Sequence, residues 1–263
     1  MTMDRGQFLG GLGAVAAGGP FTIRCAAAQL SSKTQVYDLG DQGALYRTWL
    51  DLGERPGFSC TAAVLPRRAF AASIIQHESR NGALSAVTDA AQSTGATVAI
   101  NGGYFNGAFE PDGLLIVDGK RVGQKRADWM GYLIVDGDGN ASVTSKPDLR
   151  AARYAVQGNP MIVEGGNKIG IIREDHRHVR RTVIAQSGDL VIAMVTGPVS
   201  LFKLAYALIE RPDAFYLNRI DAALNMSGAA TTSFYAKPID GEPITVPAFW
   251  PNRDVITFKP RVA

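Results

Sequence analysis

The chain has 263 residues, of which 46% are hydrophobic and 19% are charged, an ordinary globular composition with enough apolar material for a sizeable core. A net charge of +3 is too small and too scattered to indicate nucleic acid or an acidic membrane as a partner. After the N-terminal segment, no stretch approaches the roughly 18 consecutive apolar residues of a stable membrane span. The 29 glycines predict many tight turns and therefore a β-rich body.

Residues 1–28 have the pattern of an export signal. Arg5 supplies positive charge, residues 8–20 form a weakly apolar run, and three alanines give an A-x-A site that predicts cleavage before Gln29. The expected location is therefore the periplasm or the exterior of the cell. The alternative is a cytosolic protein with a disordered N-terminus.

The cysteines and histidines do not indicate a metal site. Cys25 lies inside the export segment, and Cys60 then stands alone, so no internal disulfide is expected in the mature chain. Neither cysteine has a histidine at metal-ligand spacing, and the histidines have no carboxylate or cysteine pair to complete a site. The sequence therefore predicts no metal and names no cofactor.

One domain is expected over residues 34–263, because no repeat, low-complexity stretch or Pro/Ser/Gly linker divides them. The first half has patterns of both periods, 2 for strands and 3.6 for helices. They predict, in chain order, strands at residues 44–50 and 58–65, a helix within 82–91 that ends at Gly95, and a buried strand at 97–100.

Hairpins dominate the rest of the chain. Asp-Gly pairs follow the apolar runs 114–117 and 132–135, and a Ser-Gly-Asp turn separates 183–185 from 190–195. A helix is expected from Ser200, as N-cap, to the region of Pro212, and a last strand at 255–258. These elements predict an α+β fold, with a few helices packed on a mostly antiparallel or mixed sheet.

Three turns rich in glycine or small residues, each entered from an apolar strand, are the candidate functional elements. They lie at residues 99–105, 156–163 and 223–234. Paired glycines let the backbone approach a ligand and expose amide N–H groups. A single N-G-G turn is weak evidence for a site, but the three turns together and their order are more informative.

These turns resemble those of the phosphodiester glycosidase family. That family has a strand ending in A-x-N-G-G-x-F, a later strand opening with R-T, a D-G hairpin, a helix, and a closing N-L-D-G-G-G-S. Here residues 99–105 match the first motif closely, Arg181 and Thr182 open the R-T strand, and residues 225–234 lie where the last motif belongs. The resemblance extends over roughly residues 60–240.

The last motif departs from the family pattern. Ser227 stands where the family has an aspartate, and Ala229 and Ala230 replace glycines. A serine cannot offer the negative charge that a carboxylate provides to an oxocarbenium-like centre. Catalysis then needs another acid, or the protein binds its ligand without converting it.

The candidate site residues follow from these elements. Arg181 is expected to hold a phosphate group through paired N–H donors, although pairing with a surface carboxylate is the alternative. Glu110 and Asp112, in the loop after the N-G-G turn, and Ser227 complete the candidate catalytic set. The resemblance and the turns give the candidate substrate-binding set: Asn101, Gly102, Gly103, Tyr104, Asn159, Thr182, Asn225 and Gly228.

The expected function is exported hydrolysis of sugar-1-phosphodiesters, with a glycan or sugar phosphodiester as the partner. Exopolysaccharide or envelope glycan metabolism is the expected setting. The competing hypothesis is a non-catalytic glycan-binding or envelope-assembly protein on the same scaffold, and Ser227 separates the two.

Overall fold

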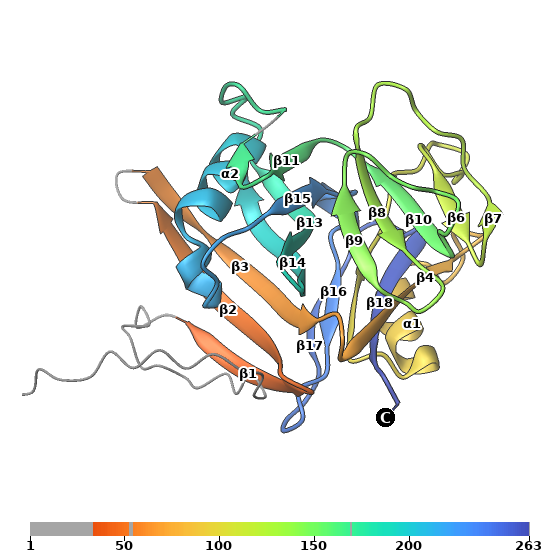
Figure 1. Ribbon diagram of the computed structural model, residues 1–263, viewed down its shortest axis with the longest axis horizontal. Coiled ribbons are helices and arrows are strands. Elements are labelled where there is room, and N and C mark those ends of the chain that lie inside the picture. Colours follow the sequence, from red (N-terminus) through yellow and green to blue (C-terminus); the bar gives the residue numbers. More distant parts are fainter. Residues whose placement is uncertain (1–33, 53–54, 169, 263) are drawn as a thin grey trace, which may run out of the picture.

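A computed structural model describes residues 34–52, 55–168 and 170–262. In these residues the chain forms three antiparallel sheets, which Figure 1 shows wrapped around a common interior. The predicted export segment, residues 1–28, and its predicted cleavage site lie outside the described residues. No helix in the described ranges is long and apolar enough to cross a membrane.

The largest sheet has eight strands in the order β1-β2-β3-β14-β13-β15-β11-β12. Its strands follow one another mainly through short hairpins, as the turn signals predict. They are β1 (Gln35–Gly40), β2 (Gly43–Leu52), β3 (Arg55–Pro66), β11 (Met161–Glu164), β12 (Asn167–Lys168), β13 (Val179–Ser187), β14 (Leu190–Val199) and β15 (Ala222–Asn225).

Two five-stranded sheets complete the fold. The first has the order β7-β6-β10-β8-β9, from β6 (Leu115–Val117), β7 (Lys120–Arg121), β8 (Gly131–Val135), β9 (Ala141–Thr144) and β10 (Tyr154–Gly158). The second has the order β17-β16-β5-β18-β4, from β4 (Phe70–Gln76), β5 (Val98–Asn101), β16 (Phe234–Ala236), β17 (Ile244–Val246) and β18 (Asp254–Pro260).

All three sheets contribute to one central core. Leu45 and Ile184 come from the large sheet, Leu133 from the second, and Ile100 and Ile256 from the third, and all are fully or almost fully buried. Alternate residues of the same strands point to the outer faces of the sheets, where apolar side chains must be buried by other elements. Helix α2 covers the outer face of the large sheet, and helix α1 covers that of the β5 sheet.

The two helices match their predicted positions with one shift. Helix α2 (Leu201–Glu210) begins after Ser200, whose hydroxyl accepts the Lys203 N–H as an N-cap should. Helix α1 (Ala86–Thr94) ends at Gly95 in the left-handed conformation but begins four residues later than the pattern predicts. The turn around Gly82, itself at φ +77°, delays the start.

The balance of elements corrects the predicted class. Beside α1 and α2 the described residues hold only two single-turn 3₁₀ segments, η1 (Pro212–Phe215) and η2 (Ala229–Thr231), so the fold is mostly β and the α+β expectation is wrong in its balance. The reason is that successive hairpins bury their faces against other strands, which leaves only two sheet faces for helices. The expected antiparallel arrangement is confirmed.

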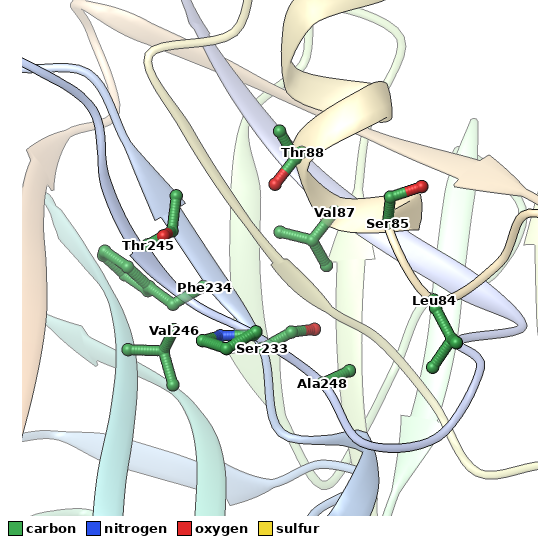
Figure 2. Close-up of a pocket in the computed structure, with 10 residues that line it drawn as sticks. Leu84, Ser85, Val87, Thr88, Ser233, Phe234, Thr245, Val246 and Ala248 are labelled. Atoms are coloured by element: carbon green, nitrogen blue, oxygen red, sulfur yellow. The ribbon is translucent and has the colours of Figure 1, made fainter.

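A shallow groove runs between α1 and β17. Its volume is about 330 Å³, and Figure 2 shows its walls with side chains as sticks. Helix residues on one side include Val87 and Thr88, and Thr245 and Val246 lie opposite. Ser233 also lines the groove, and no charged side chain of the described residues does so.

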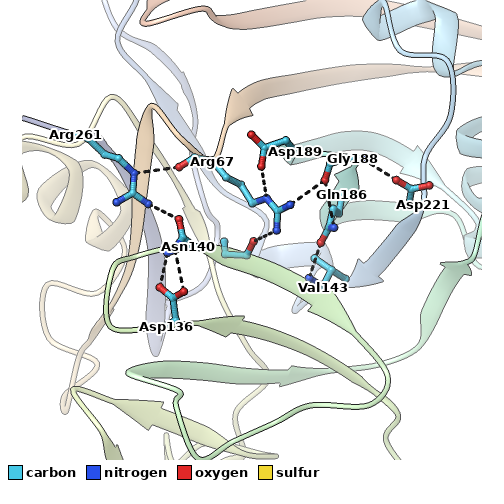
Figure 3. A network of polar contacts seen from close by, with 10 residues as sticks. Arg67, Asp136, Asn140, Val143, Gln186, Gly188, Asp189, Asp221 and Arg261 are labelled. Carbon is cyan, nitrogen blue, oxygen red and sulfur yellow. Dashed lines mark hydrogen bonds and ion pairs between the residues drawn. The ribbon is translucent and has the colours of Figure 1, made fainter. Parts of the chain in front are cut away.

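Polar side chains tie the sheets together at one end of their strands (Figure 3). Arg67 pairs with Asp189 at 3.2 Å, and Arg261 donates to the Arg67 carbonyl and to Asn140. Asp221 accepts the Gly188 N–H at 2.7 Å. Gly188, Asp221 and Arg261 of this polar network lie next to one end of β13, β15 and β18. The candidate turns lie near the other end of these strands.

The described residues contain one cysteine, and the removal of Cys25 with residues 1–28 stays a prediction. Cys60 is a free, buried thiol on β3, and burial raises its pKa far above the ordinary range. Cys25 lies outside the described part of the chain.

Candidate functional site

The three turns meet at the junction between the sheets. The N-G-G turn follows β5, Asn159 and Pro160 connect β10 to β11 through a cis peptide, and the third turn follows β15. Register brings them together, because Val183 of β13 pairs with Asn225 of β15 while Ile100 of β5 pairs with Phe234 of β16. The structure therefore brings the three turns close together.

Asn101 lies at the centre of this junction and is 1% exposed. Its Oδ1 accepts the Thr182 hydroxyl at 2.7 Å and the Ser233 N–H at 3.0 Å, and its Nδ2 donates to the Ser227 carbonyl at 2.6 Å. These contacts join β5, β13 and the third turn. Because its side-chain amide is hydrogen-bonded to protein groups, Asn101 has a structural role: it holds β5, β13 and the third turn together.

Tyr104 joins the N-G-G turn to the other two turns. Its hydroxyl donates to the Asn159 carbonyl at 2.8 Å and accepts from Asn225 Nδ2, which also donates to that carbonyl. Asn225 Oδ1 is buried and has no hydrogen-bond partner among the described residues, which leaves one acceptor at this point. Burial raises the Tyr104 pKa to about 12, against the opposing effect of Arg181 and the Asn225 hydrogen bond.

Arg181 lies on the same face of the large sheet as Asn225, because both share a face with Val183. Its side chain is buried, and Nε donates to the Val199 carbonyl at 3.0 Å and Nη2 to the Arg177 carbonyl at 2.8 Å. These bonds use two of the five N–H groups of a guanidinium. Burial lowers the pKa of Arg181, and the nearby Tyr104 and Asp175 oppose this effect.

Arg177 adds a second cation beside Arg181. It is exposed, and its guanidinium makes no hydrogen bond or ion pair with a described residue. It lies close enough to Tyr104 and Arg181 to lower the pKa of both. Arg180, by contrast, points to the other face, where it donates to the carbonyls of Ala229, Thr232 and Pro247.

Ser227 and Gly228 lie directly against the N-G-G turn. The Ser227 N–H donates to the Gly102 carbonyl at 3.2 Å, and its hydroxyl lies 2.9 Å from the Thr231 hydroxyl. Ser227 is 7% exposed, so the position that holds an aspartate in the family pattern is enclosed here. A Cβ atom at Gly228 would lie 3.0 Å from the Arg180 carbonyl, which favours glycine at this close approach.

Glu110 and Asp112 do not join this network. Glu110 is exposed and accepts from Asn106 at 3.2 Å, and Asp112 pairs with Arg126 at 3.0 Å. Both lie in a loop that folds back on itself, since the Asp112 N–H donates to the Tyr104 carbonyl. The ring of Trp129, in the separate loop between β7 and β8, packs edge-on against Tyr104, with the ring centres 5.0 Å apart.

A carboxyl group that the sequence analysis did not single out lies beneath the N-G-G turn. Asp254, at the start of β18, is 2% exposed, and its Oδ2 accepts the Gly103 N–H at 2.8 Å. Among the described residues it is the only buried acidic side chain. An acidic residue opening the buried apolar strand 255–258 was the available signal, because carboxylates are rarely buried without a role.

Exposed aromatic side chains lie at the rim of the groove beside the third turn. Phe249 is 72% and Trp250 49% exposed, and both backbone N–H groups donate to the Ala230 carbonyl. The Arg180 guanidinium lies 4.5 Å from the Phe249 ring centre. Ser233, which lines the groove in Figure 2, is the residue whose N–H donates to Asn101.

The fold and the site define a mostly β domain in which two of the turns place a tyrosine and an asparagine beside two arginines from β13 and the segment before it. This chain belongs to the phosphodiester glycosidase family, whose sequence model matches residues 94–258. The match includes all three turns and most of β18. No match was found among curated protein sequences.

Solved structures show the same fold at low sequence identity. The catalytic domain of zebrafish N-acetylglucosamine-1-phosphodiester alpha-N-acetylglucosaminidase, auto-inhibited by its pro-peptide, is 15% identical with a TM-score of 0.59, over 87% of this chain and 88% of that one. A hypothetical protein from Synechocystis is 10% identical with a TM-score of 0.61, over 87% and 64% of the two chains. A putative exported protein from Burkholderia pseudomallei is 12% identical with a TM-score of 0.51, over 78% and 75%.

Proposed function

We propose that this protein is an exported hydrolase that cleaves sugar-1-phosphodiesters into a free sugar and a phosphomonoester. The observation that carries the proposal is the pair of guanidinium groups, Arg181 and Arg177, beside Tyr104 and Asn225 where the three turns meet. A phosphodiester carries one negative charge, and guanidinium groups are opposite to it in sign and fit its oxygens in hydrogen-bond geometry. Membership of the phosphodiester glycosidase family supports the reaction class.

In this proposal each residue has a separate task. Arg181, held by the Val199 and Arg177 carbonyls, binds a phosphate oxygen with the N–H groups that these bonds leave over. Asn225 Oδ1 accepts a sugar hydroxyl, since it is the acceptor without a protein partner. Water adds to the sugar carbon and the phosphomonoester departs, a leaving group that needs less protonation than an alcohol.

The experiment is a screen of purified protein against a panel of sugar-1-phosphodiesters that differ in sugar and in aglycone. Free sugar and phosphomonoester are measured together, and hydrolysis in ¹⁸O-labelled water identifies the broken bond. The proposal requires the label in the sugar, because the glycosidic C–O bond breaks. Label in the phosphate would show cleavage of the P–O bond and a different enzyme class.

A second candidate function is glycan binding without turnover. The observation that favours it is Ser227, an uncharged residue where the family pattern has an aspartate, enclosed and paired with Thr231. The exposed rings of Phe249 and Trp250 offer stacking surfaces for sugars. Binding of a sugar-1-phosphodiester with no product after long incubation would favour this function.

Substitution of Ser227 separates the two functions. We expect Ser227→Asp to raise turnover of a sugar-1-phosphodiester, because general acid–base catalysis contributes on the order of 10²–10⁴-fold. Ser227→Asn is the matched control, since it adds similar volume without charge. Product release by wild type, Asp and Asn variants is compared under identical conditions. Robust wild-type turnover that Ser227→Asp abolishes would show that the serine itself serves the chemistry.

Export is the second testable part of this proposal. We expect protein recovered from the native cell to begin at Gln29 and to lie in the periplasmic or culture fraction, because residues 1–28 have the charge, apolar run and cleavage site of a signal. N-terminal sequencing of the fractionated native protein measures both properties. Recovery of chains that begin at Met1 from the cytosol would refute export.

A further inference from the structure

The N-G-G turn and Asp254 are fitted to one another. The Asp254 carbonyl accepts the Gly102 N–H at 2.9 Å, and its side-chain Oδ2 accepts the Gly103 N–H at 2.8 Å. A Cβ atom at Gly102 would lie 2.0 Å from Oδ2, so any side chain there would displace the carboxyl group. The two glycines thus make room for a carboxyl group on the inner side of the turn.

The buried position of Asp254 disfavours the ionised form of its carboxyl group. Its side chain is buried, and the Gly103 bond is its only hydrogen bond within the described residues. Burial raises the pKa of Asp254 to about 6. The hydrogen bond from Gly103 and the positive charge of Arg253, the preceding residue, both lower this pKa, but burial has the larger effect. At neutral pH the carboxylate is therefore mainly ionised although it is buried.

We propose that Asp254 is a positioning residue of the site, whose ionised carboxylate fixes the Gly103 amide and thereby the placement of Tyr104. This role rests on the proposed function, because Tyr104 is the residue that joins the turn to Asn159 and Asn225. A carboxylate binds an amide N–H through a charge-assisted hydrogen bond, which is stronger than the bond to a neutral acceptor. Protonation therefore loosens Gly103 and, through it, the tyrosine next in the chain.

The same group has opposite effects on stability and activity. Because its folded pKa is above the unfolded value, its contribution to stability is fully present below the unfolded pKa and is lost as pH rises through the folded pKa of about 6. Two pKa units correspond to about a 100-fold change in the folding equilibrium constant. Activity, which needs the ionised form, rises over the same pH range.

The experiment compares wild type with Asp254→Asn, which keeps an acceptor oxygen for Gly103 and removes the charge. We expect the variant to lose turnover by about 10- to 100-fold in kcat with little change in KM, and to lose the rise of kcat near pH 6. Its folding constant relative to wild type, from urea unfolding, should increase by about 100-fold between pH 4 and pH 8. A merely structural residue would weaken folding and leave the shape of the pH profile unchanged.

Asp118→Asn is the control for loss of one carboxylate. Asp118 is exposed, and hydrogen bonds from Tyr154 and Arg153 lower its pKa, so its removal should weaken folding above the unfolded pKa, the opposite trend. We expect an unchanged kcat profile for this variant. An Asp254→Asn protein with wild-type kcat at every pH would overturn the proposal.

Backbone NMR separates this inference from the proposed function. In wild-type protein the Gly103 amide and the Tyr104 ring signals should titrate together near pH 6, and Asp254→Asn should abolish both titrations. If wild type hydrolyses no diester while these signals titrate together, the coupling holds and the proposed reaction is wrong. If diesters are hydrolysed while the Tyr104 signals stay constant through the titration, the reaction holds and the positioning role is wrong.

Discussion

Replacing Arg181 with lysine is expected to lower kcat/KM for a sugar-1-phosphodiester by about 10²- to 10³-fold, the usual effect of removing one preorganised donor from developing charge. Lysine keeps the positive charge but lacks the fixed fork of donors. It also cannot bind the Val199 and Arg177 carbonyls in the way that the two guanidinium nitrogens do. The measurement is steady-state hydrolysis, with circular dichroism to confirm folding.

Arg177→Ala is the companion variant. Arg177 is exposed and its guanidinium makes no hydrogen bond or ion pair with a described residue, so the substitution should leave folding unchanged and raise KM more than it lowers kcat. The phosphate-binding role predicts that rising salt weakens substrate binding less in this variant than in wild type, because one exposed cation has been removed. If Arg181→Lys hydrolyses the substrate with the kcat/KM of wild type, Arg181 does not bind the phosphate.

Asn101→Ala is expected to destabilise the fold by about 3–5 kcal/mol. The substitution removes three hydrogen bonds, each contributing about 1 kcal/mol, and leaves the Thr182 hydroxyl, the Ser233 N–H and the Ser227 carbonyl buried without their partner. For a domain of this size the melting temperature should fall by roughly 10 °C. Thermal and urea unfolding of the purified variant measure the loss.

Asn167→Ala is the matched control for this second prediction. Asn167 is exposed on β12 and makes one long side-chain hydrogen bond, to the Gly165 carbonyl at 3.3 Å, so its loss should change stability by less than about 0.5 kcal/mol. Equal stability of Asn101→Ala and wild type would show that the junction of the three turns is held together elsewhere.

Local sequence patterns predicted the individual elements well. Alternation and turn residues located β2, β3, β13 and β14, and the Ser200 cap located the start of α2, because hairpins and caps depend on neighbouring residues. The predicted family is confirmed, since its motifs are local strings in a set order. The balance of helix and strand was wrong, because whether a sheet face is covered by a helix or by strands is a property of packing.

Closeness in sequence to the N-G-G turn did not identify the carboxyl group that contacts this turn in the structure. Glu110 and Asp112 follow the N-G-G turn within a few residues, yet their side chains bind Asn106 and Arg126 and none of the residues at the junction of the three turns. Asp254 is separated from Gly103 by 151 positions and lies directly beneath it. Strand pairing between β5 and β18 creates that contact, and no pattern within either segment reports it.

By itself the sequence determined most of the strands and turns, the family, and the candidate residue types for the proposed site, because these depend on side-chain chemistry and short-range geometry. Only the tertiary structure decided which groups are committed to the fold and which remain for a ligand. The side-chain amide of Asn101 makes three hydrogen bonds to protein groups, whereas Asn225 Oδ1 has no hydrogen-bond partner among the described residues. The physical reason is that hydrogen-bond satisfaction depends on the register of strands far apart in the chain, which fixes each buried group's partners.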